Sequence, residues 1–448
     1  MAVVNGIIND DWQVRVVSRR LVQASDSSVK PHVLAVSNLD LISQTMQNSM
    51  FCIYPRPPTG DFNTVIAAFE AGLPCFLDHF FPFAGRIATD PSSGLPEIHC
   101  NNHGTELLVG EADVALASID YGTMTTSVRR VQQPYGEDMA LSVQLVSFAC
   151  GGFTVAWCTN HVLVDGSALS LLVDSWSALA RSGTLAADRR PNHDRSSVFF
   201  RPRAPPSYSD SLDEAFTPLD AERQINVLTA EQSFAASREG ARATRVQAVS
   251  AYLWKALAGV VGTADARCRM QWWVNGRPRL SAAPAAIRNY IGNVATTVIR
   301  EACVEEVQRM ALPDVAAMVR EAIAAPAYDE HFLELVDWVE EHKTQRFVET
   351  ASLGLGSPTV GVTSFASFKI DTDFGFGCAV MAMPTTTPTA SVKRLCSGFF
   401  QIAARPHDDD GSWIASAFLW PRLAAALQSD VTRIFKPLTA EYLGLISS

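Results

Sequence analysis

FTVAWCTNHVLVDG, residues 153–166, carries the strongest structural signal in this chain. Its first half is rich in β-branched and aromatic side chains, which is typical of a buried strand. Apolar side chains then recur at helical spacing over residues 168–179, where Asp165 or Ser167 can cap the first turn. His161 is therefore predicted to lie on a short strand-to-helix connection that is held at both ends. Catalytic bases are often presented on such connections.

The H-x-x-x-D spacing of His161 and Asp165 is weak evidence by itself. A chain with nine histidines contains such a pair by chance about every second time. Judged by the spacing alone, a histidine with a purely structural role is the favoured interpretation. A second motif far downstream, DFGFG at residues 373–377, favours a catalytic role.

Together the two motifs resemble the marks of the BAHD acyltransferases, plant enzymes that move an acyl group from coenzyme A to an alcohol or an amine. Those marks are HxxxDG in mid-chain and DFGWG near the C-terminus. Further segments are similar to the family and occur in its order, namely LAVSNLD (34–40), FPFAGR (81–86), VSAYLW (249–254), NGRPRL (275–280) and YIGN (290–293). The resemblance covers nearly the whole chain. It implies two similar α/β domains of the chloramphenicol-acetyltransferase type, with the active site at their interface.

Residues 183–218 lose the apolar periodicity and carry several prolines among charges and serines, which is typical of a linker. We therefore predict an N-terminal acyltransferase domain at 1–182 that carries HxxxD, a long crossover linker at 183–218, and a C-terminal acyltransferase domain at 219–448 that carries DFGFG. Both domains mix helices and strands, so the expected fold class is α/β.

Apolar spacing also predicts individual elements. Residues 63–80 are predicted to form a helix that Pro74 must kink or end. We expect further helices over 246–260 and from Pro313 onward, since proline is tolerated at the first helical position. Strands are expected at 271–274 and 294–299.

Composition and charge narrow the function classes. With 448 residues and 48 % apolar content, the chain can bury a large core. Its net charge of −10 argues against nucleic acid as a partner, because such binding needs a basic surface. The chain shows no signal-peptide pattern and no apolar run of about eighteen residues, and its nine cysteines are scattered as in reduced proteins. We expect a cytoplasmic monomer without membrane contact.

Acyl-CoA is expected as a co-substrate, with no permanently bound cofactor. Because coenzyme A is a polyanion, even an acidic protein needs a local basic patch to bind it. Two groups of arginines are candidates, although ordinary linker arginines are the favoured interpretation of the first. The first group is Arg189, Arg190, Arg195, Arg201 and Arg203, and the second is Arg277, Arg279 and Arg288.

Other motif-like strings are better explained without a function. Asp373-Phe374-Gly375 occurs without the glycine-rich loop, strand lysine and H-R-D loop of a kinase. HCNNH at residues 99–103 has metal-like residue types, but it lies in an expected strand and turn, so we predict no metal site. The chain also contains no G-x-S-x-G, P-loop or dinucleotide fingerprint.

Acyl transfer from a thioester requires a base, because an alcohol or amine attacks slowly unless its proton is removed as the bond forms. A neutral imidazole suits that task near neutral pH, so His161 is the predicted general base. It would return the proton to the departing thiolate. No acyl-enzyme is needed, because the thioester is already activated.

The resemblance assigns structural roles to the remaining motif residues. In the family the aspartate of HxxxDG points away from the site and pairs with an arginine. This implies that Asp165 pairs with Arg277, or alternatively with Arg279, while Gly166 lets the backbone pack closely. The residues implied to be architectural in the second motif are Asp373, Gly375 and Gly377.

Two substitutions depart from the family. Phe376 replaces the tryptophan of DFGWG and removes an indole N–H. Thr363-Ser364-Phe365 replaces the Thr-Ser-Trp of hydroxycinnamoyl transferases. Phe365 cannot donate to an oxyanion, so either Thr363 or another donor takes that duty.

The expected reaction moves an aromatic, hydroxycinnamoyl-like acyl group to a hydroxyl or amine. A carboxylate acceptor is disfavoured, because the arginine of shikimate-type enzymes is absent, and YIGNV at 290–294 matches the malonyl-transferring branch only in part. The alternative is a non-catalytic relative that binds small molecules or partners. The intact motif around His161 favours an enzyme, whereas the changes at Phe365 and Phe376 keep the alternative open.

Overall fold

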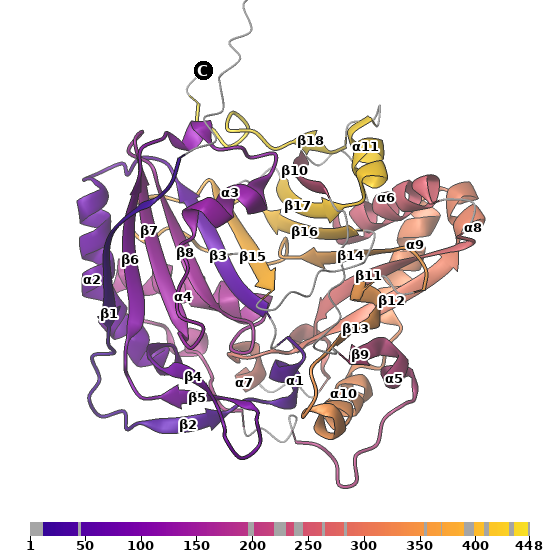
Figure 1. Cartoon of the computed structure of the whole chain (residues 1–448), viewed down its shortest axis with the longest axis horizontal. Helices are drawn as coiled ribbons and strands as arrows, with labels where there is room; N and C mark the ends of the chain where they lie inside the picture. Colours follow the sequence, from indigo (N-terminus) through magenta and orange to yellow (C-terminus); the bar gives the residue numbers. More distant parts are fainter. Residues whose placement is uncertain are drawn as a thin grey trace, which may run out of the picture.

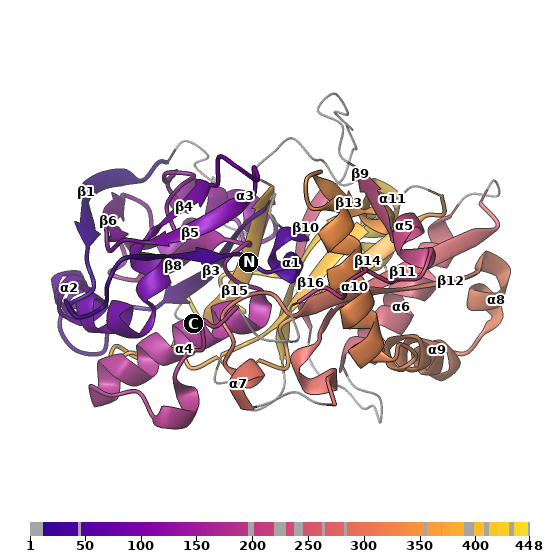
Figure 2. The same ribbon diagram turned by 90° about the horizontal axis from the view of Figure 1, so that it is seen from below.

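The computed structural model of this protein describes residues 12–43, 46–195, 201–218, 230–236, 245–261, 265–281, 285–353, 356–368, 370–388, 398–406, 412–429 and 434–446. Two large sheets lie side by side and organise the two halves of the molecule (Figure 1). Figure 2, seen from below, places β15 and α1 near the boundary between the halves.

The first sheet has six strands in the order β1-β6-β7-β8-β3-β15. β6 and β7 are parallel, and the other neighbours are antiparallel. The strands are β1 (Arg15–Val22), β3 (Met46–Tyr54), β6 (Thr105–Ala112), β7 (Leu141–Phe148), β8 (Phe153–Asn160) and β15 (Met381–Pro388). A smaller sheet contains β2 (His32–Ala35), β5 (Pro96–Cys100) and β4 (Arg86–Thr89). The helices of this half are α2 (Phe62–His79), α3 (Met124–Val131) and α4 (Gly166–Ser182). The short helix α1 (Asn38–Leu41) comes from the same part of the chain but packs against α10 (Tyr328–His342) of the second half.

The second sheet has seven strands in the order β12-β11-β14-β16-β17-β10-β18. They are β10 (Ala230–Ala236), β11 (Arg267–Asn275), β12 (Ala295–Cys303), β14 (Thr359–Ser364), β16 (Gly398–Ala404), β17 (Trp413–Leu419) and β18 (Lys436–Pro437). The helices of this half are α5 (Ser211–Ala215), α6 (Arg245–Val260), α7 (Ala285–Arg288), α8 (Val304–Arg309), α9 (Leu312–Ala324), α10 (Tyr328–His342) and α11 (Pro421–Ser429). A separate ribbon pairs β9 (Phe216–Pro218) with β13 (Phe347–Glu349).

The two halves are tied together by β15. This strand follows DFGFG in the chain, yet it pairs antiparallel with β3 and completes the first sheet. The predicted α/β class is confirmed by the mixture of sheets and helices. The domain bounds of 1–182, 183–218 and 219–448 stay a prediction. The pairing of β15 with β3 shows in addition that residues 381–388 pack with the first half.

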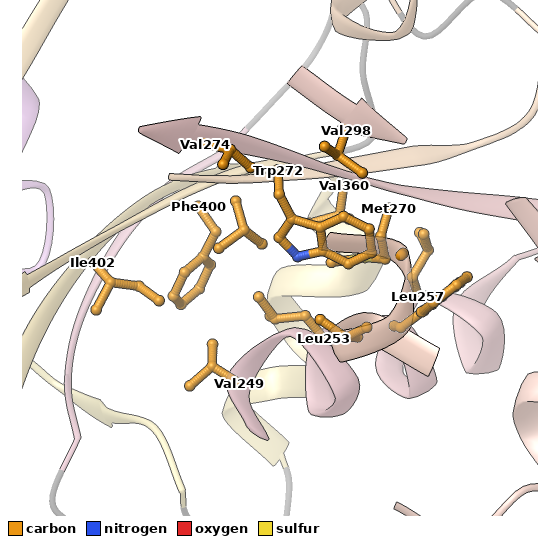
Figure 3. Packing of buried hydrophobic residues seen from close by; sticks show 14 of the residues in the cluster. Val249, Leu253, Leu257, Met270, Trp272, Val274, Val298, Val360, Phe400 and Ile402 are labelled. Atoms are coloured by element: carbon orange, nitrogen blue, oxygen red, sulfur yellow. The ribbon is translucent and has the colours of Figure 1, made fainter. Parts of the chain in front are cut away.

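The core of the second half shows why α6 packs on its sheet (Figure 3). Val249, Leu253 and Leu257 recur every four residues on one face of α6 and are buried. This face lies against Trp272 of β11, whose Nε1 donates to Oγ of Ser250 at 2.9 Å. Burying each such apolar side chain stabilises the fold by about 1.5–3 kcal/mol. Helical spacing in the sequence therefore fixes which face of α6 is buried.

Pro74 does not end its helix, because α2 continues through it to His79. A proline inside a helix removes one backbone hydrogen bond. Phe69, Leu73 and Phe76 lie on the same helix and are fully buried, so packing offsets the lost bond. None of the described helices combines the length and apolar character needed to cross a membrane.

Candidate active site

His161 lies between the end of β8 at Asn160 and the start of α4 at Gly166. Its backbone N–H donates to the carbonyl oxygen of Met46 on β3 at 2.9 Å. The side-chain Oδ1 of Asn160 accepts from the backbone N–H of Val162 at 2.9 Å. The connection is thus bonded on both sides of His161, which fixes where the imidazole projects.

Asn293 fixes the tautomer of this imidazole. Its Nδ2 donates to the carbonyl oxygen of His161 at 2.8 Å and to Oδ1 of Asp40 at 2.9 Å. Both partners are acceptors, so the amide oxygen of Asn293 must face the imidazole, where it lies 3.1 Å from Nδ1. Nδ1 therefore carries the proton in the neutral ring, and Nε2 keeps a free lone pair.

Asp40 in turn holds Asn293. It is fully buried, and its Oδ1 also accepts from the backbone N–H of Asn293 at 2.8 Å. Its Oδ2 accepts from the backbone N–H of Ser37 at 2.8 Å and from Nε of Arg195 at 3.1 Å. Asp40 and Asn293 belong to the family-like segments LAVSNLD and YIGN, but motif similarity alone assigns them no role. The sequence feature that could have identified these two residues is a polar side chain within a largely apolar segment.

The pKa of His161 lies below its ordinary value of 6.5, and burial is the main cause. The charges of Asp165 and Glu349 and the hydrogen bond with Asn293 act in the opposite direction without reversing the shift. His161 is therefore a neutral base at neutral pH.

Both carboxylate oxygens of Asp165 accept hydrogen bonds from groups that shape the fold. As the N-cap of α4, it accepts from the backbone N–H of Ala168 at 2.9 Å. Its other oxygen accepts from Nη1 of Arg277 at 2.6 Å and from the backbone N–H of Val294 at 2.9 Å. Both charged side chains are 5 % exposed. Arg279, the alternative partner, instead lies over the ring of Tyr328, at 5.0 Å from its centroid.

Arg277 also bonds to the backbone of the second half of the protein. Its Nη2 donates to the carbonyl oxygens of Tyr290 and Gly292, each at 3.0 Å. The pair therefore joins the start of α4 to the segment before β12, in which Asn293 also lies. It shapes the loop that carries His161 without touching the imidazole.

A cavity between the two halves is lined by His161 and encloses about 1030 Å³, including its open mouth. Thr363 in β14 and Phe365 just after that strand line the cavity together with Gly166. A Cβ on Gly166 would lie 2.3 Å from Cε1 of Phe365, so glycine is required for this ring to pack against the start of α4. Asp165 also lines the cavity, so the structure brings five of the predicted residues together there.

A family model described as "Transferase family" matches residues 12–432 of this chain. The chain belongs to this family, the BAHD acyltransferases. The resemblance drawn from the motifs is confirmed, and the protein is an acyl-CoA-dependent acyltransferase.

Curated relatives are similar over most of their length. Putrescine hydroxycinnamoyltransferase 1 of Oryza sativa subsp. japonica is 27 % identical, over 81 % of this chain and 88 % of its own. Omega-hydroxypalmitate O-feruloyl transferase of Arabidopsis thaliana is 25 % identical, over 82 % of this chain and 83 % of its own.

Solved structures share the fold. Vinorine synthase matches with a TM-score of 0.69 at 22 % identity, covering 95 % of this chain and 99 % of its own. F. graminearum TRI101 in complex with ethyl coenzyme A matches with a TM-score of 0.70 at 14 % identity, covering 90 % of this chain and 98 % of its own. The predicted pair of chloramphenicol-acetyltransferase-like domains is thereby confirmed.

In this BAHD acyltransferase, no residue of DFGFG lines the cavity around His161. Oδ1 of Asp373 accepts from the backbone N–H groups of Gly375 at 2.8 Å and Gly377 at 3.2 Å. Both glycines have positive φ angles, 105° and 84°. Residues with a side chain adopt this backbone conformation only at a cost in free energy. Phe374 is buried and packs edge-on against Tyr54, with ring centroids 5.3 Å apart. The motif thus forms a tight turn anchored in the core of the first half.

Four of the eight arginines proposed for coenzyme A phosphates carry ion pairs within the BAHD fold. The pairs are Arg189–Asp174 at 3.0 Å, Arg195–Asp40 at 3.1 Å, Arg203–Asp337 at 2.5 Å and Arg277–Asp165 at 2.6 Å. His99 of the HCNNH segment contacts Glu97. Within the described ranges, no group of three His, Cys, Asp or Glu side chains could hold a metal ion.

Proposed function

We propose that this BAHD acyltransferase moves an aromatic, hydroxycinnamoyl-like acyl group from acyl-CoA to a hydroxyl or amine of a small molecule, with His161 as the general base. The observation that carries the proposal is the geometry of His161, whose Nδ1 is held by Asn293 and whose ring lines the cavity. This arrangement leaves Nε2 free to accept a proton.

The reaction needs no covalent enzyme intermediate. The acceptor oxygen or nitrogen attacks the thioester carbonyl while Nε2 of His161 takes its proton. When the tetrahedral intermediate collapses, the carbon–sulfur bond breaks and the imidazolium returns the proton to the thiolate. Thr363, which lines the cavity beside Phe365, is the proposed donor to the oxyanion, because Phe365 has no N–H.

An aromatic acyl group is supported by the walls of the cavity and by the relatives. Trp273 and Phe399 line the cavity, and their rings meet edge to face with centroids 5.3 Å apart. Such rings favour a planar aromatic guest. Related proteins are named putrescine hydroxycinnamoyltransferase, agmatine coumaroyltransferase and omega-hydroxypalmitate O-feruloyl transferase. Their names include both amine and hydroxyl acceptors.

The activity is expected to fall at acid pH with a midpoint below pH 6.5. His161 must be neutral to act, and burial lowers its pKa from 6.5, so the midpoint of its protonation lies below that value. We would measure kcat/KM against pH with an alcohol acceptor, which does not itself titrate in this range. An acid limb centred above pH 6.5, in protein that stays folded, would contradict the assignment of His161.

A mass-spectrometric screen tests the proposed function. Purified protein is incubated with hydroxycinnamoyl, benzoyl, acetyl and longer aliphatic CoA thioesters and with a panel of alcohols and amines. An ester or amide product accompanied by one equivalent of free coenzyme A supports the proposal. Saturable ligand binding without any product across the panel would favour the non-catalytic alternative instead.

We further propose that the protein acts as a cytoplasmic monomer. The support for a cytoplasmic location is compositional, because the cysteines are scattered without paired spacing. Light scattering of the purified protein and imaging of a tagged chain would test the two statements.

A further inference from the structure

Glu349 is a buried carboxylate at the edge of the catalytic cavity. It is the last residue of β13, where it pairs in register with Phe216 of β9. Only 5 % of the residue is exposed, and both Glu349 and Phe216 line the same cavity as His161. The charge of Glu349 is close enough to act on the pKa of His161.

Glu349 differs from the other buried carboxylates in the described ranges. Each of those carboxylates forms an ion pair with an arginine. The pairs are Asp40–Arg195, Glu106–Arg19, Asp165–Arg277 and Asp337–Arg203. Within the part of the chain that the structure describes, the Glu349 side chain has no hydrogen bond or counter-ion. Burying an unpaired charge is costly, so a site that keeps one gains when a cation enters.

The rest of the cavity favours a cation as well. No lysine or arginine is among the described residues that line it. Asp165 is neutralised by Arg277, and the imidazole of His161 is neutral. Glu349 is therefore left as the uncompensated charge of the lining, surrounded largely by apolar walls that strengthen its field.

We propose that Glu349 binds an ammonium or guanidinium group of the acceptor, so that the preferred acceptor is a cationic amine acylated at its other, uncharged amine. This inference rests on the proposed acyl transfer and names its acceptor class. The uncharged nitrogen forms the amide bond, its proton passes to Nε2 of His161, and the thiolate leaves with that proton. The distal cationic group keeps its proton throughout and orients the acceptor.

The test uses pairs of acceptors that differ only in the distal charge. Straight-chain diamines of increasing length are each compared with the monoamine of the same length. Equilibrium binding in the presence of coenzyme A and kcat/KM with p-coumaroyl-CoA are measured for the wild-type protein, Glu349→Gln and Glu305→Gln. Glu305 is a control carboxylate on α8 that is 73 % exposed and is not among the residues that line the cavity.

At least one diamine should bind the wild-type protein at least ~10-fold more tightly than its monoamine. Glu349→Gln should weaken diamine binding and raise the KM for the diamine by about 10- to 100-fold, whereas monoamine binding should change little and Glu305→Gln should behave like the wild type.

Equal binding of every diamine and its monoamine, or equal diamine binding by wild type and Glu349→Gln, would overturn the proposal. Because binding is scored separately from turnover, these results are distinct from failure of acyl transfer itself. That failure would appear as the absence of product with every acceptor, alcohols included.

Discussion

His161→Ala is expected to lower kcat at least ~100-fold, the usual scale for losing a general base. The variant removes the nitrogen that accepts the acceptor's proton, and no second histidine lines the cavity among the described residues. The fold should persist, because the bond from residue 161 to Met46 uses the backbone N–H. Steady-state kinetics and thermal unfolding of the same preparations measure the two effects.

His103→Ala is the matched control, since His103 is exposed on the connection between β5 and β6. It should leave kcat and the melting temperature close to wild type. If the His161 variant keeps near-normal turnover, then another group supplies the base and the proposed mechanism fails.

Asp165→Ala is expected to destabilise the protein by about 3–5 kcal/mol, because it leaves the buried guanidinium of Arg277 without its counter-charge. The substitution also removes the cap of α4, whose bond to the backbone of Ala168 is 2.9 Å long. Turnover should fall too, since the loop that aims His161 loses its anchor. Chemical denaturation gives the free energy of unfolding.

A double-mutant cycle separates the ion pair from its surroundings. Asp165→Ala and Arg277→Met should together cost less than the sum of the two single changes, with a coupling energy of about 1–3 kcal/mol. The exposed pair Glu305–Arg309 on α8 is the matched control, and its coupling should be only about 0.3–0.5 kcal/mol. Strict additivity at Asp165 and Arg277 would show that the buried pair does not couple the two halves.

Local patterns predict the strand and the helix on either side of His161. The strand expected at 153–159 is β8, and the helix expected after Asp165 is α4. The buried face of α6 follows in the same way from its apolar spacing. These predictions succeed because each depends on neighbours within one helix or strand.

Such patterns do not predict contacts between segments that lie far apart in the sequence. The partner of Asp165 came from family resemblance alone, since Arg277 lies 112 positions away. Asn293 and Glu349 reach the cavity only because the second sheet and the β9–β13 ribbon pack beside the first half. No local periodicity encodes which polar side chain meets the imidazole. Likewise, nothing near residues 381–388 indicates pairing with β3.

In the proposed mechanism the acyl group passes directly from the thioester to the acceptor, and His161 moves the proton. Intact-mass spectrometry of the denatured protein after incubation with acyl-CoA alone tests it most directly. The protein mass should stay unchanged, and coenzyme A should be released only after acceptor is added. A mass gain equal to the acyl group, located on a cysteine or serine and discharged by acceptor at the rate of turnover, would contradict it and establish a ping-pong mechanism.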